Sequence, residues 1–247
     1  MNKKMYNEIS ELYDKVFPFS KQKLSFLNNY LQKGKILDLA CGTGTYTIPL
    51  ANENEMSGFD LDEGMIKIAK SKSPNNIDFK VKNMMDVNSL KEYNSIFSIG
   101  NSIVHITDLD KLGKLLKNLN VSLKDEGVLI LQIVNYDRIL TNNIKELPKI
   151  ENEGVTFTRR YNQKNNGLID FITTISYKDF SKTNQVELVP LKKDLLINLL
   201  EKSNFEITKT FGSFNEEPFS IKDSFHLILI CKKKRYNKVV SLKQRVN

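Results

Sequence analysis

The chain is 247 residues long, with an ordinary share of apolar residues and a net charge of +8, which suits one domain with an ample core. No stretch approaches the roughly 20 apolar residues of a membrane span, and residues 1–6 do not lead into the apolar core of a signal peptide. Cys41 and Cys231 lack metal-ligand spacing. We therefore expect a cytoplasmic protein with no metal and no membrane contact. Seven Lys and Arg and no acid lie in residues 231–247, so the charge belongs to a basic tail, 232–247, and the nearly neutral body disfavours a nucleic-acid partner.

The first predicted element is helical. Apolar residues fall at helical spacing from Tyr6 to Phe17, ahead of Pro18, and Tyr13 lies on this apolar face. We expect a helical cover over residues 1–31 that packs on the rest of the domain.

Residues 36–44, Ile-Leu-Asp-Leu-Ala-Cys-Gly-Thr-Gly, hold the clearest motif. A strand is expected at 35–40, a turn with two glycines follows, and a helix is expected at 44–52. Glycines let a ligand approach the backbone closely, and a helix start offers free N–H groups. A phosphate-binding loop would need a Gly-Lys-Ser/Thr run, which is absent, and a nicotinamide or flavin site would need a small residue where Thr47 stands. A structural turn that binds nothing is the plain alternative.

Asp38, Ala40, Gly42 and Gly44 resemble the first motif of class I S-adenosylmethionine (SAM)-dependent methyltransferases, which reads Asp/Glu-x-Gly-x-Gly-x-Gly. Ala40 replaces the first glycine and keeps the position small. A carboxylate suits the cationic sulfonium and the amino group of SAM better than it suits a pyrophosphate. The resemblance implies that these four residues bind SAM.

The second strand, 55–60, ends in Asp60, and a helix is expected at 63–71. In dinucleotide-binding units an acid at this strand end accepts hydrogen bonds from ribose hydroxyls. The run from Gly58 to Met65 resembles the same methyltransferases, which implies cofactor contacts from Asp60, Leu61 and Met65. Asp62 is expected to cap the helix.

The third strand, 76–82, leads into Asn83-Met84-Met85-Asp86. The resemblance places Asn83 where the family has the Asp that takes the adenine amino group, and an Asn oxygen can accept the same bond. Met84 would pack on the purine. Asp86 is either a further cofactor contact or a helix cap.

The fourth strand, 94–100, is followed by Gly100 and Asn101, which the resemblance places beside the methionine part of SAM. The Asn/Asp-Pro-Pro-aromatic motif of base and amide methyltransferases and the Pro-Cys of cytosine enzymes are absent. His105 is a candidate acid or base, with a structural role as the alternative.

A helix at 108–121 and a strand at 127–134 precede Asn135-Tyr136-Asp137-Arg138-Ile139-Leu140. This run resembles the glycine N-methyltransferase branch. The resemblance implies that Asn135 helps to hold an amino acid substrate, with Tyr136 as its neighbour.

Two alternating runs around Asn165-Asn166-Gly167 predict an inserted antiparallel hairpin at 150–187, after a polar break at 140–153. Arg159 and Arg160 are candidates to complete a carboxylate clamp, and strand alternation lets only one of them point inward. The alternative is that both face solvent.

A helix from Pro190 to Leu200 and strands at 205–211 and 224–231 complete the chain, and the two strands resemble the antiparallel edge of the methyltransferase sheet. The expected fold is α/β: one domain, 1–247, with a Rossmann-like, seven-stranded, mostly parallel sheet, helices on both faces and a small inserted antiparallel lid. The resemblance implies transfer of the SAM methyl group to an amine or hydroxyl of a small molecule, with the leading helix over the cofactor and Tyr13 or His105 as proton acceptor. The alternatives are an RNA or protein methyltransferase that uses the basic tail, and a SAM-binding regulator without transfer activity.

Overall fold

A computed structural model describes residues 12–74 and 76–234 of the protein. Residues 1–11 of the predicted helical cover and residues 235–247 of the predicted basic tail lie outside the described residues. Within the described ranges, no helix is long and apolar enough to cross a membrane, and no group of His, Cys, Asp and Glu is arranged to hold a metal ion.

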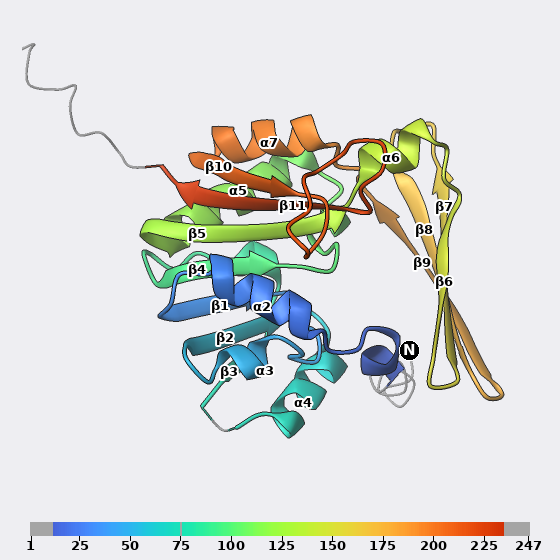
Figure 1. The fold of residues 1–247 in the computed structure, drawn as a ribbon, viewed down its shortest axis with the longest axis horizontal. Coiled ribbons are helices and arrows are strands. Elements are labelled where there is room, and N and C mark those ends of the chain that lie inside the picture. Colours follow the sequence, from blue (N-terminus) through green and yellow to red (C-terminus); the bar gives the residue numbers. More distant parts are fainter. Residues whose placement is uncertain (1–11, 75, 235–247) are drawn as a thin grey trace, which may run out of the picture.

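The main sheet has seven strands in the order β10-β11-β5-β4-β1-β2-β3. Five of them run parallel, while β11 is antiparallel to β5 and β10 is antiparallel to β11. The strands are β1 Lys35–Leu39, β2 Glu55–Asp60, β3 Asp78–Val81, β4 Tyr93–Ser98, β5 Leu123–Val134, β10 Phe205–Phe211 and β11 His226–Lys233. The α/β sheet predicted from the alternating pattern is confirmed, including its antiparallel edge (Figure 1).

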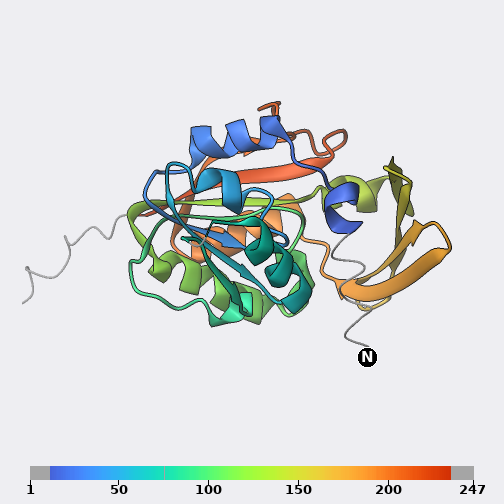
Figure 2. The same ribbon diagram turned by 90° about the horizontal axis from the view of Figure 1, so that it is seen from below.

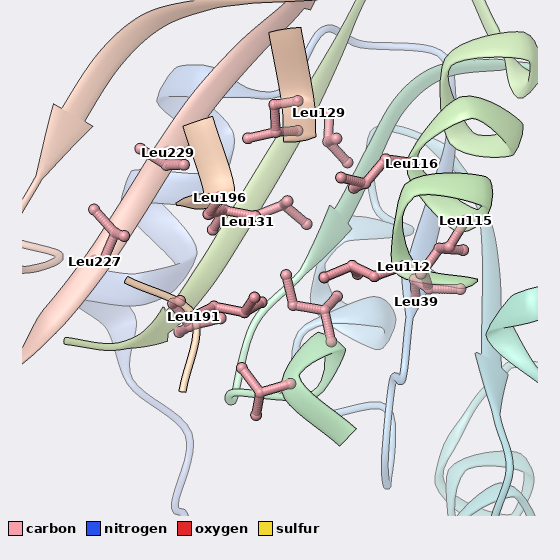
Figure 3. Close-up of a cluster of buried hydrophobic side chains, with 14 of the residues drawn as sticks. Leu39, Leu112, Leu115, Leu116, Leu129, Leu131, Leu191, Leu196, Leu227 and Leu229 are labelled. Carbon is pink, nitrogen blue, oxygen red and sulfur yellow. The ribbon is translucent and has the colours of Figure 1, made fainter. Parts of the chain in front are cut away.

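Helices cover both faces of this sheet because its strands alternate between two apolar faces. In β1, Ile36 packs with the residues of α2, α3 and α4, while Leu37 and Leu39 pack with those of α5 and α7. Figure 3 shows part of the second cluster, and Figure 2 shows α2 and α5 on opposite sides of the sheet. The helices are α2 Lys21–Tyr30, α3 Thr47–Leu50, α4 Glu63–Lys72, α5 Leu109–Ser122, α6 Tyr136–Thr141 and α7 Lys193–Lys202, with 3₁₀ turns η1 Met84–Asp86 and η2 Ile103–His105.

Local capping residues set where several helices begin. Asp62 accepts a hydrogen bond from the backbone N–H of Met65 at 3.0 Å, which confirms the predicted cap of α4. Asp108 caps α5 in the same way. The helix predicted at 44–52 is shorter than expected, because residues 40–46 turn over the end of β1 and only α3, a single turn containing Pro49, is helical.

A second sheet of four antiparallel strands is inserted between α6 and α7. Its strands are β6 Glu146–Asn152, β7 Val155–Gln163, β8 Ile169–Tyr177 and β9 Phe180–Leu188. The hairpin predicted around Asn165-Asn166-Gly167 is its centre, β7 and β8, and β6 falls in the predicted polar break. An edge strand tolerates the proline at position 148 and many polar residues, so β6 carries little apolar signal.

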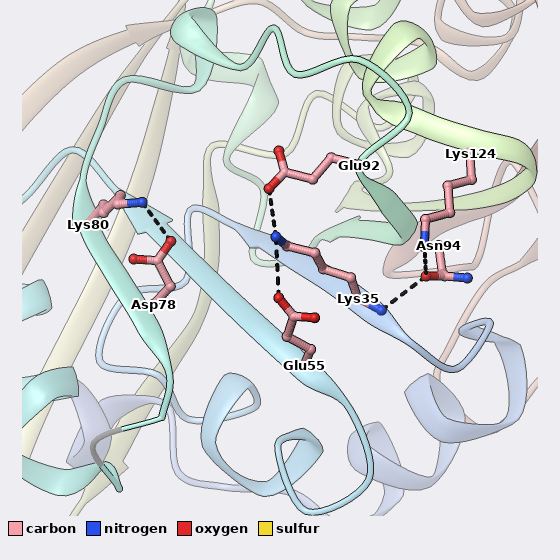
Figure 4. A network of polar contacts seen from close by, with 7 residues as sticks. All are labelled: Lys35, Glu55, Asp78, Lys80, Glu92, Asn94 and Lys124. Atoms are coloured by element: carbon pink, nitrogen blue, oxygen red, sulfur yellow. Dashed lines mark hydrogen bonds and ion pairs between the residues drawn. The ribbon is translucent and has the colours of Figure 1, made fainter.

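The two ends of the main sheet differ in chemistry. At the amino ends of the strands, Lys35 pairs with Glu55 at 3.2 Å and with Glu92 at 2.8 Å, and Asn94 accepts hydrogen bonds from Lys124 and from the Lys35 backbone (Figure 4). These groups satisfy one another. The second sheet lies beyond the carboxyl ends of the parallel strands (Figure 1). In α/β sheets, ligands bind at this end of the strands.

Candidate active site

The loop after β1 has an unusual backbone. Ala40, Gly42 and Gly44 all have positive φ angles, of 65°, 55° and 76°, a region that glycine enters freely and alanine enters at a cost. The backbone N–H groups of Ala40 and Cys41 both donate to the carbonyl of Phe59 in β2, at 2.8 and 3.0 Å. The loop is thereby fixed against the end of the neighbouring strand.

Asp38 lies beneath this loop, where it is only 4% exposed. Its Oδ2 accepts a hydrogen bond of 2.6 Å from the hydroxyl of Thr47, the first residue of α3. Burial, with a smaller contribution from the charge of Asp60, raises the pKa of Asp38 to about 7, although the Thr47 hydrogen bond opposes the shift. Thr47, which made a dinucleotide site a poor fit to the sequence, is the residue that holds this carboxylate.

Asp60 ties the loop to the end of β2. Its two carboxylate oxygens accept hydrogen bonds from the backbone N–H groups of Gly42, at 2.8 Å, and Asp62, at 2.9 Å. Burial raises the pKa of Asp60 above its ordinary value. Neither Asp38 nor Asp60 has an ion-pair partner among the residues that the structure describes. A ligand with positive charge would therefore stabilise the ionised form of both carboxylates.

Further along the strand ends, the surface becomes apolar. Leu61 is 70% exposed and Val81, which is paired in register with Asp60, is 52% exposed. Met65 and Met84 are half-buried at the same end of the sheet. Exposed apolar side chains at adjacent strand ends suit the face of a planar base.

The loop after β3 is held by Asn83, which caps η1 by accepting the backbone N–H of Met85 at 2.9 Å. Asp86 is exposed and is the last residue of η1, so Asn83 is the cap in this loop and the capping role considered for Asp86 is wrong. An amide oxygen has two lone pairs, so Asn83 keeps one for a ligand.

A cavity of about 390 Å³ opens beside the loop. It lies between the ends of β1, β4, β5 and β11, the N-terminal segment and the second sheet. The predicted site residues that line it are Tyr13, Asp38, Ala40, Gly100, Asn101, His105 and Arg159.

The N-terminal segment closes one side of the cavity. Residues 12–16 are helical, and Leu12 and Val16 pack on Val155 and Ile175 of the second sheet. Asp14 accepts hydrogen bonds from the hydroxyls of the loop threonines at positions 43 and 45, at 2.5 and 3.3 Å, and contacts Lys72.

Tyr13 lies over Gly42, and a β-carbon at this glycine position would be 3.6 Å from the Tyr13 ring. Burial, followed by the charge of Asp60, raises the pKa of Tyr13 to about 12. Its hydroxyl therefore stays protonated at neutral pH, which argues against the proton-acceptor role expected for Tyr13 from the resemblance.

Asn101 joins the ends of β4 and β5. It has a φ of 70°, its Oδ1 accepts the backbone N–H of Val134 at 2.9 Å, and its Nδ2 donates to the Tyr136 hydroxyl at 2.9 Å. His105 is exposed at the rim of the cavity, and desolvation lowers its pKa, so it is neutral at pH 7 and able to accept a proton.

Asn135 and Tyr136 do not line the cavity, in contrast to the expected substrate contact. Asn135 is 1% exposed, and its Nδ2 lies within 2.9 to 3.2 Å of the carbonyls of Ser220, Ile221 and Ser224. Its Oδ1 caps α6. Because every polar atom of this side chain is engaged, Asn135 holds the 220–224 loop against α6.

The second sheet contributes one cationic side chain to the cavity. Phe157, Arg159 and Tyr161 alternate along β7 and all line it, whereas Arg160 is exposed on the other face. Arg159 donates from Nη2 to the carbonyl of Pro148 at 2.8 Å. Its Nε and the Tyr161 hydroxyl are buried without a hydrogen-bond partner among the described residues.

Among the cavity residues that were not predicted as site residues are Lys23 of α2, Gln132 of β5 and His226 of β11. Gln132 looks like a core position of a strand, and no pattern in the sequence separates it from its apolar neighbours. His226 is the first residue of β11, and antiparallel pairing with β5 places it beside the end of that strand.

The site fits SAM in the described geometry. Asp38 and Asp60 are acids without cationic partners in the described part of the chain, the loop between them brings backbone within reach of a ligand, and the apolar strand ends beyond suit an adenine. The cavity beside Asp38 then leaves room for an acceptor.

Comparison with known proteins supports SAM as the cofactor. Residues 36–127 match the family described as "Methyltransferase domain". A glycine/sarcosine/dimethylglycine N-methyltransferase of Actinopolyspora halophila is 29% identical over 195 residues, which are 73% of this chain but 33% of that protein. A glycine/sarcosine N-methyltransferase of Aphanothece halophytica is 27% identical over 193 residues, 74% of this chain and 70% of the relative. A SAM-dependent methyltransferase from Clostridium acetobutylicum superposes with a TM-score of 0.79 at 20% identity, over 94% of this chain and 100% of the other, and so shares the fold. The chain spans about a third of the length of the Actinopolyspora protein.

Proposed function

Because the chain contains a class I SAM-dependent methyltransferase domain with SAM as its cofactor, we propose that the protein methylates the amine of a small acceptor that carries a carboxylate. The acceptor lies in the cavity beside Asp38, under the second sheet. The glycine and sarcosine N-methyltransferases named above act on acceptors of this kind by their names, and they support the proposal.

One observation carries the choice of acceptor. Arg159 Nε and the Tyr161 hydroxyl are buried in the cavity wall and lack partners among the described residues. An unsatisfied buried donor costs about 1–3 kcal/mol, and native proteins rarely leave one without a reason. Two donors on alternate residues of one strand suit a carboxylate, which accepts from both an Arg and a hydroxyl.

The aromatic side chains of the cavity wall also favour the binding of a carboxylate. Tyr161 stacks on Phe171 with ring centroids 5.3 Å apart, and Cζ of Arg159 lies 5.8 Å from the centroid of the Phe157 ring. These rings remove water from the guanidinium, and the pKa of Arg159 falls below its ordinary value because of that desolvation. A charge pair formed in such surroundings is stronger than one in water.

When bound, SAM supplies an electrophilic methyl group on a sulfonium. Such a transfer depends on alignment, which can contribute about 7–11 kcal/mol, and the cavity walls provide it by fixing the acceptor's carboxylate. The N-terminal segment, where Leu12 and Val16 pack on the second sheet, covers one side of the cavity. A protonated amine must first lose its proton, and His105, neutral at the rim, is the group placed to accept it.

The cavity volume of about 390 Å³ favours a small molecule over an RNA or protein acceptor. The SAM-binding residues alone do not separate an enzyme from a SAM-binding regulator. The unpartnered pair at Arg159 and Tyr161 favours an enzyme, because a SAM-only regulator has no need of a second ligand.

The test is a methyl-transfer assay with glycine, sarcosine and dimethylglycine, alongside methylamine as an acceptor without a carboxylate. We expect turnover with at least one of the carboxylate acceptors and little with methylamine. Arg159→Met should raise the acceptor KM by about 10- to 100-fold, the scale of a charged hydrogen bond lost, with SAM affinity unchanged.

Arg160→Met is the matched control, because it removes the same charge from the exposed face of the same strand. It should leave the acceptor KM within about twofold, as expected of an isolated surface charge. Equal effects of the two variants, or SAM binding with no turnover of any carboxylate acceptor, would refute the proposal.

A further inference from the structure

Gln132 and His226 form a polar pair within the wall of the cavity. Gln132 is 5% exposed in β5, and its Oε1 accepts the backbone N–H of Gly100 at 2.7 Å. Its Nε2 lies 3.1 Å from Nδ1 of His226 on the neighbouring strand, β11. The pair thus connects the loop after β4 to β11.

These contacts determine which ring nitrogen of His226 carries the proton. A backbone N–H can only donate, so the oxygen of the Gln132 amide must face Gly100 and its nitrogen must face the imidazole. The amide nitrogen is itself a donor, so the ring nitrogen beside it presents a lone pair. The proton of a neutral His226 is therefore on Nε2.

The surroundings keep the ring neutral and fixed. His226 lies between Phe225 and Phe214, with centroid distances of 4.8 and 5.8 Å. Burial, together with the positive charges of Lys23 and Arg159, lowers its pKa to about 4. Nε2–H has no hydrogen-bond partner among the residues that the structure describes, although His226 lines the cavity.

Lys23 adds to the positive side of the cavity. Its ammonium lies 5.4 Å from the Phe214 ring centroid and has no carboxylate partner in the described part of the chain. Lys23, His226 and Arg159 are thus all donors that line the cavity. A neutral N–H flanked by two cations matches an anionic oxygen.

We propose that His226 is a specificity-determining residue that donates Nε2–H to a carboxylate bound in the cavity, and that Gln132 is the positioning residue that fixes this tautomer. The inference deepens the proposed function and rests on it for the site. His226 is not a base in this arrangement, because Nδ1 already accepts a hydrogen bond and Nε2 carries the proton. The carboxylate comes either from the acceptor or from the methionine part of SAM.

The first test reads the tautomer directly by ¹⁵N NMR of histidine-labelled protein. The chain has two histidines, so His105→Gln assigns the remaining signals to His226. We expect an Nε2–H imidazole that stays neutral at pH 6. An Nδ1–H tautomer, or an imidazolium at pH 6, would overturn the inference.

Ligands then separate the two sources of the carboxylate without any need for turnover. S-adenosylhomocysteine carries the methionine carboxylate, and methoxyacetate has the shape of sarcosine without its amine. A shift of the His226 Nε2–H signal with S-adenosylhomocysteine alone assigns the cofactor carboxylate, and a shift only after methoxyacetate is added assigns the acceptor. No shift with either ligand refutes the role of His226, whereas a shift without turnover of any amino acid refutes the proposed reaction alone.

Two variants test the donor itself. His226→Phe fits between the two phenylalanines and removes the N–H, and it should weaken binding of the ligand identified by NMR by ~10-fold or more, the scale of a hydrogen bond to a charged group. His226→Gln places an amide donor at similar reach and should restore most of the affinity. Equal binding by both variants would show a packing role only, and the NMR measurement on the unaltered chain decides the matter where a variant fails to fold.

Discussion

Replacement of Asp38 by Asn should make the SAM-free protein more stable and its binding of SAM weaker. Asp38 is 4% exposed and its only side-chain hydrogen bond among the described residues comes from Thr47. An Asn oxygen can accept that bond, so the substitution removes the charge and little else.

The size of the effect follows from the pKa. A rise from the ordinary value of 3.8 to about 7 corresponds to roughly 4 kcal/mol in favour of the protonated form. The folded state then binds more protons than the unfolded state between these two values, so the stability of the SAM-free protein falls as pH rises from about 4 to about 7. We expect Asp38→Asn to exceed the unaltered protein by about 1 kcal/mol at pH 4.5 and by up to roughly 4 kcal/mol at pH 8.

SAM binding should show the opposite trend. A cationic ligand favours ionised Asp38, so SAM affinity should rise with pH up to about 7, by about tenfold per unit below that value. Asp38→Asn should lose both the pH dependence and the tighter binding.

The measurements are urea unfolding and SAM calorimetry at pH 5, 6, 7 and 8, with two buffers of different ionisation enthalpy to count released protons. Asp110→Asn, an exposed acid in the first turn of α5, is the control. A SAM affinity that is independent of pH, or a variant less stable at pH 8 than the unaltered chain, would refute the reasoning.

Two further substitutions test the scaffold of the site. Ala40→Gly relieves a φ of 65° and should raise the free energy of unfolding by about 0.5–1 kcal/mol, the left-handed cost of an L-residue less the entropy of glycine, as measured by urea unfolding at pH 7. Asn135→Ala removes the side-chain donor that the carbonyls of Ser220, Ile221 and Ser224 share and should lower the unfolding free energy by about 2–3 kcal/mol. Methyl-transfer kinetics should then show that the folded fraction of this variant has an acceptor KM similar to that of the unaltered protein. A large rise in KM with unchanged stability would instead indicate that Asn135 binds the substrate.

The main sheet could be predicted from the sequence because each parallel strand is short, apolar and bounded by polar turns. Asp62 is an N-cap that predicts where α4 begins, and it accepts the backbone N–H of Met65, three residues later. The acids Asp38 and Asp60 mark the ends of two strands. Such signals are local, and they survive without knowledge of the fold. SAM as the cofactor was implied by the resemblance of these strand ends to SAM-dependent methyltransferases.

Contacts between distant segments could not be predicted in this way. Asn135 follows a strand end, as a ligand residue would, yet its amide serves carbonyls about 85 residues further along the chain. His226 is separated from Gln132 by 94 residues. Nothing in either local sequence tells a structural amide from a site residue.

In the second sheet, the side chains that reach the cavity depend on which face of β7 is turned toward it. Alternation predicts that Arg159 and Arg160 face opposite sides, but the sequence does not say which side holds the cavity. The cavity side is fixed by Val155, which packs on Leu12 and Val16 of the N-terminal segment. Since residues 155, 157, 159 and 161 share a face, that packing contact turns Arg159 and Tyr161 toward the cavity. The same cluster that joins the N-terminal segment to the second sheet therefore also selects the side chains by which an acceptor would be recognised.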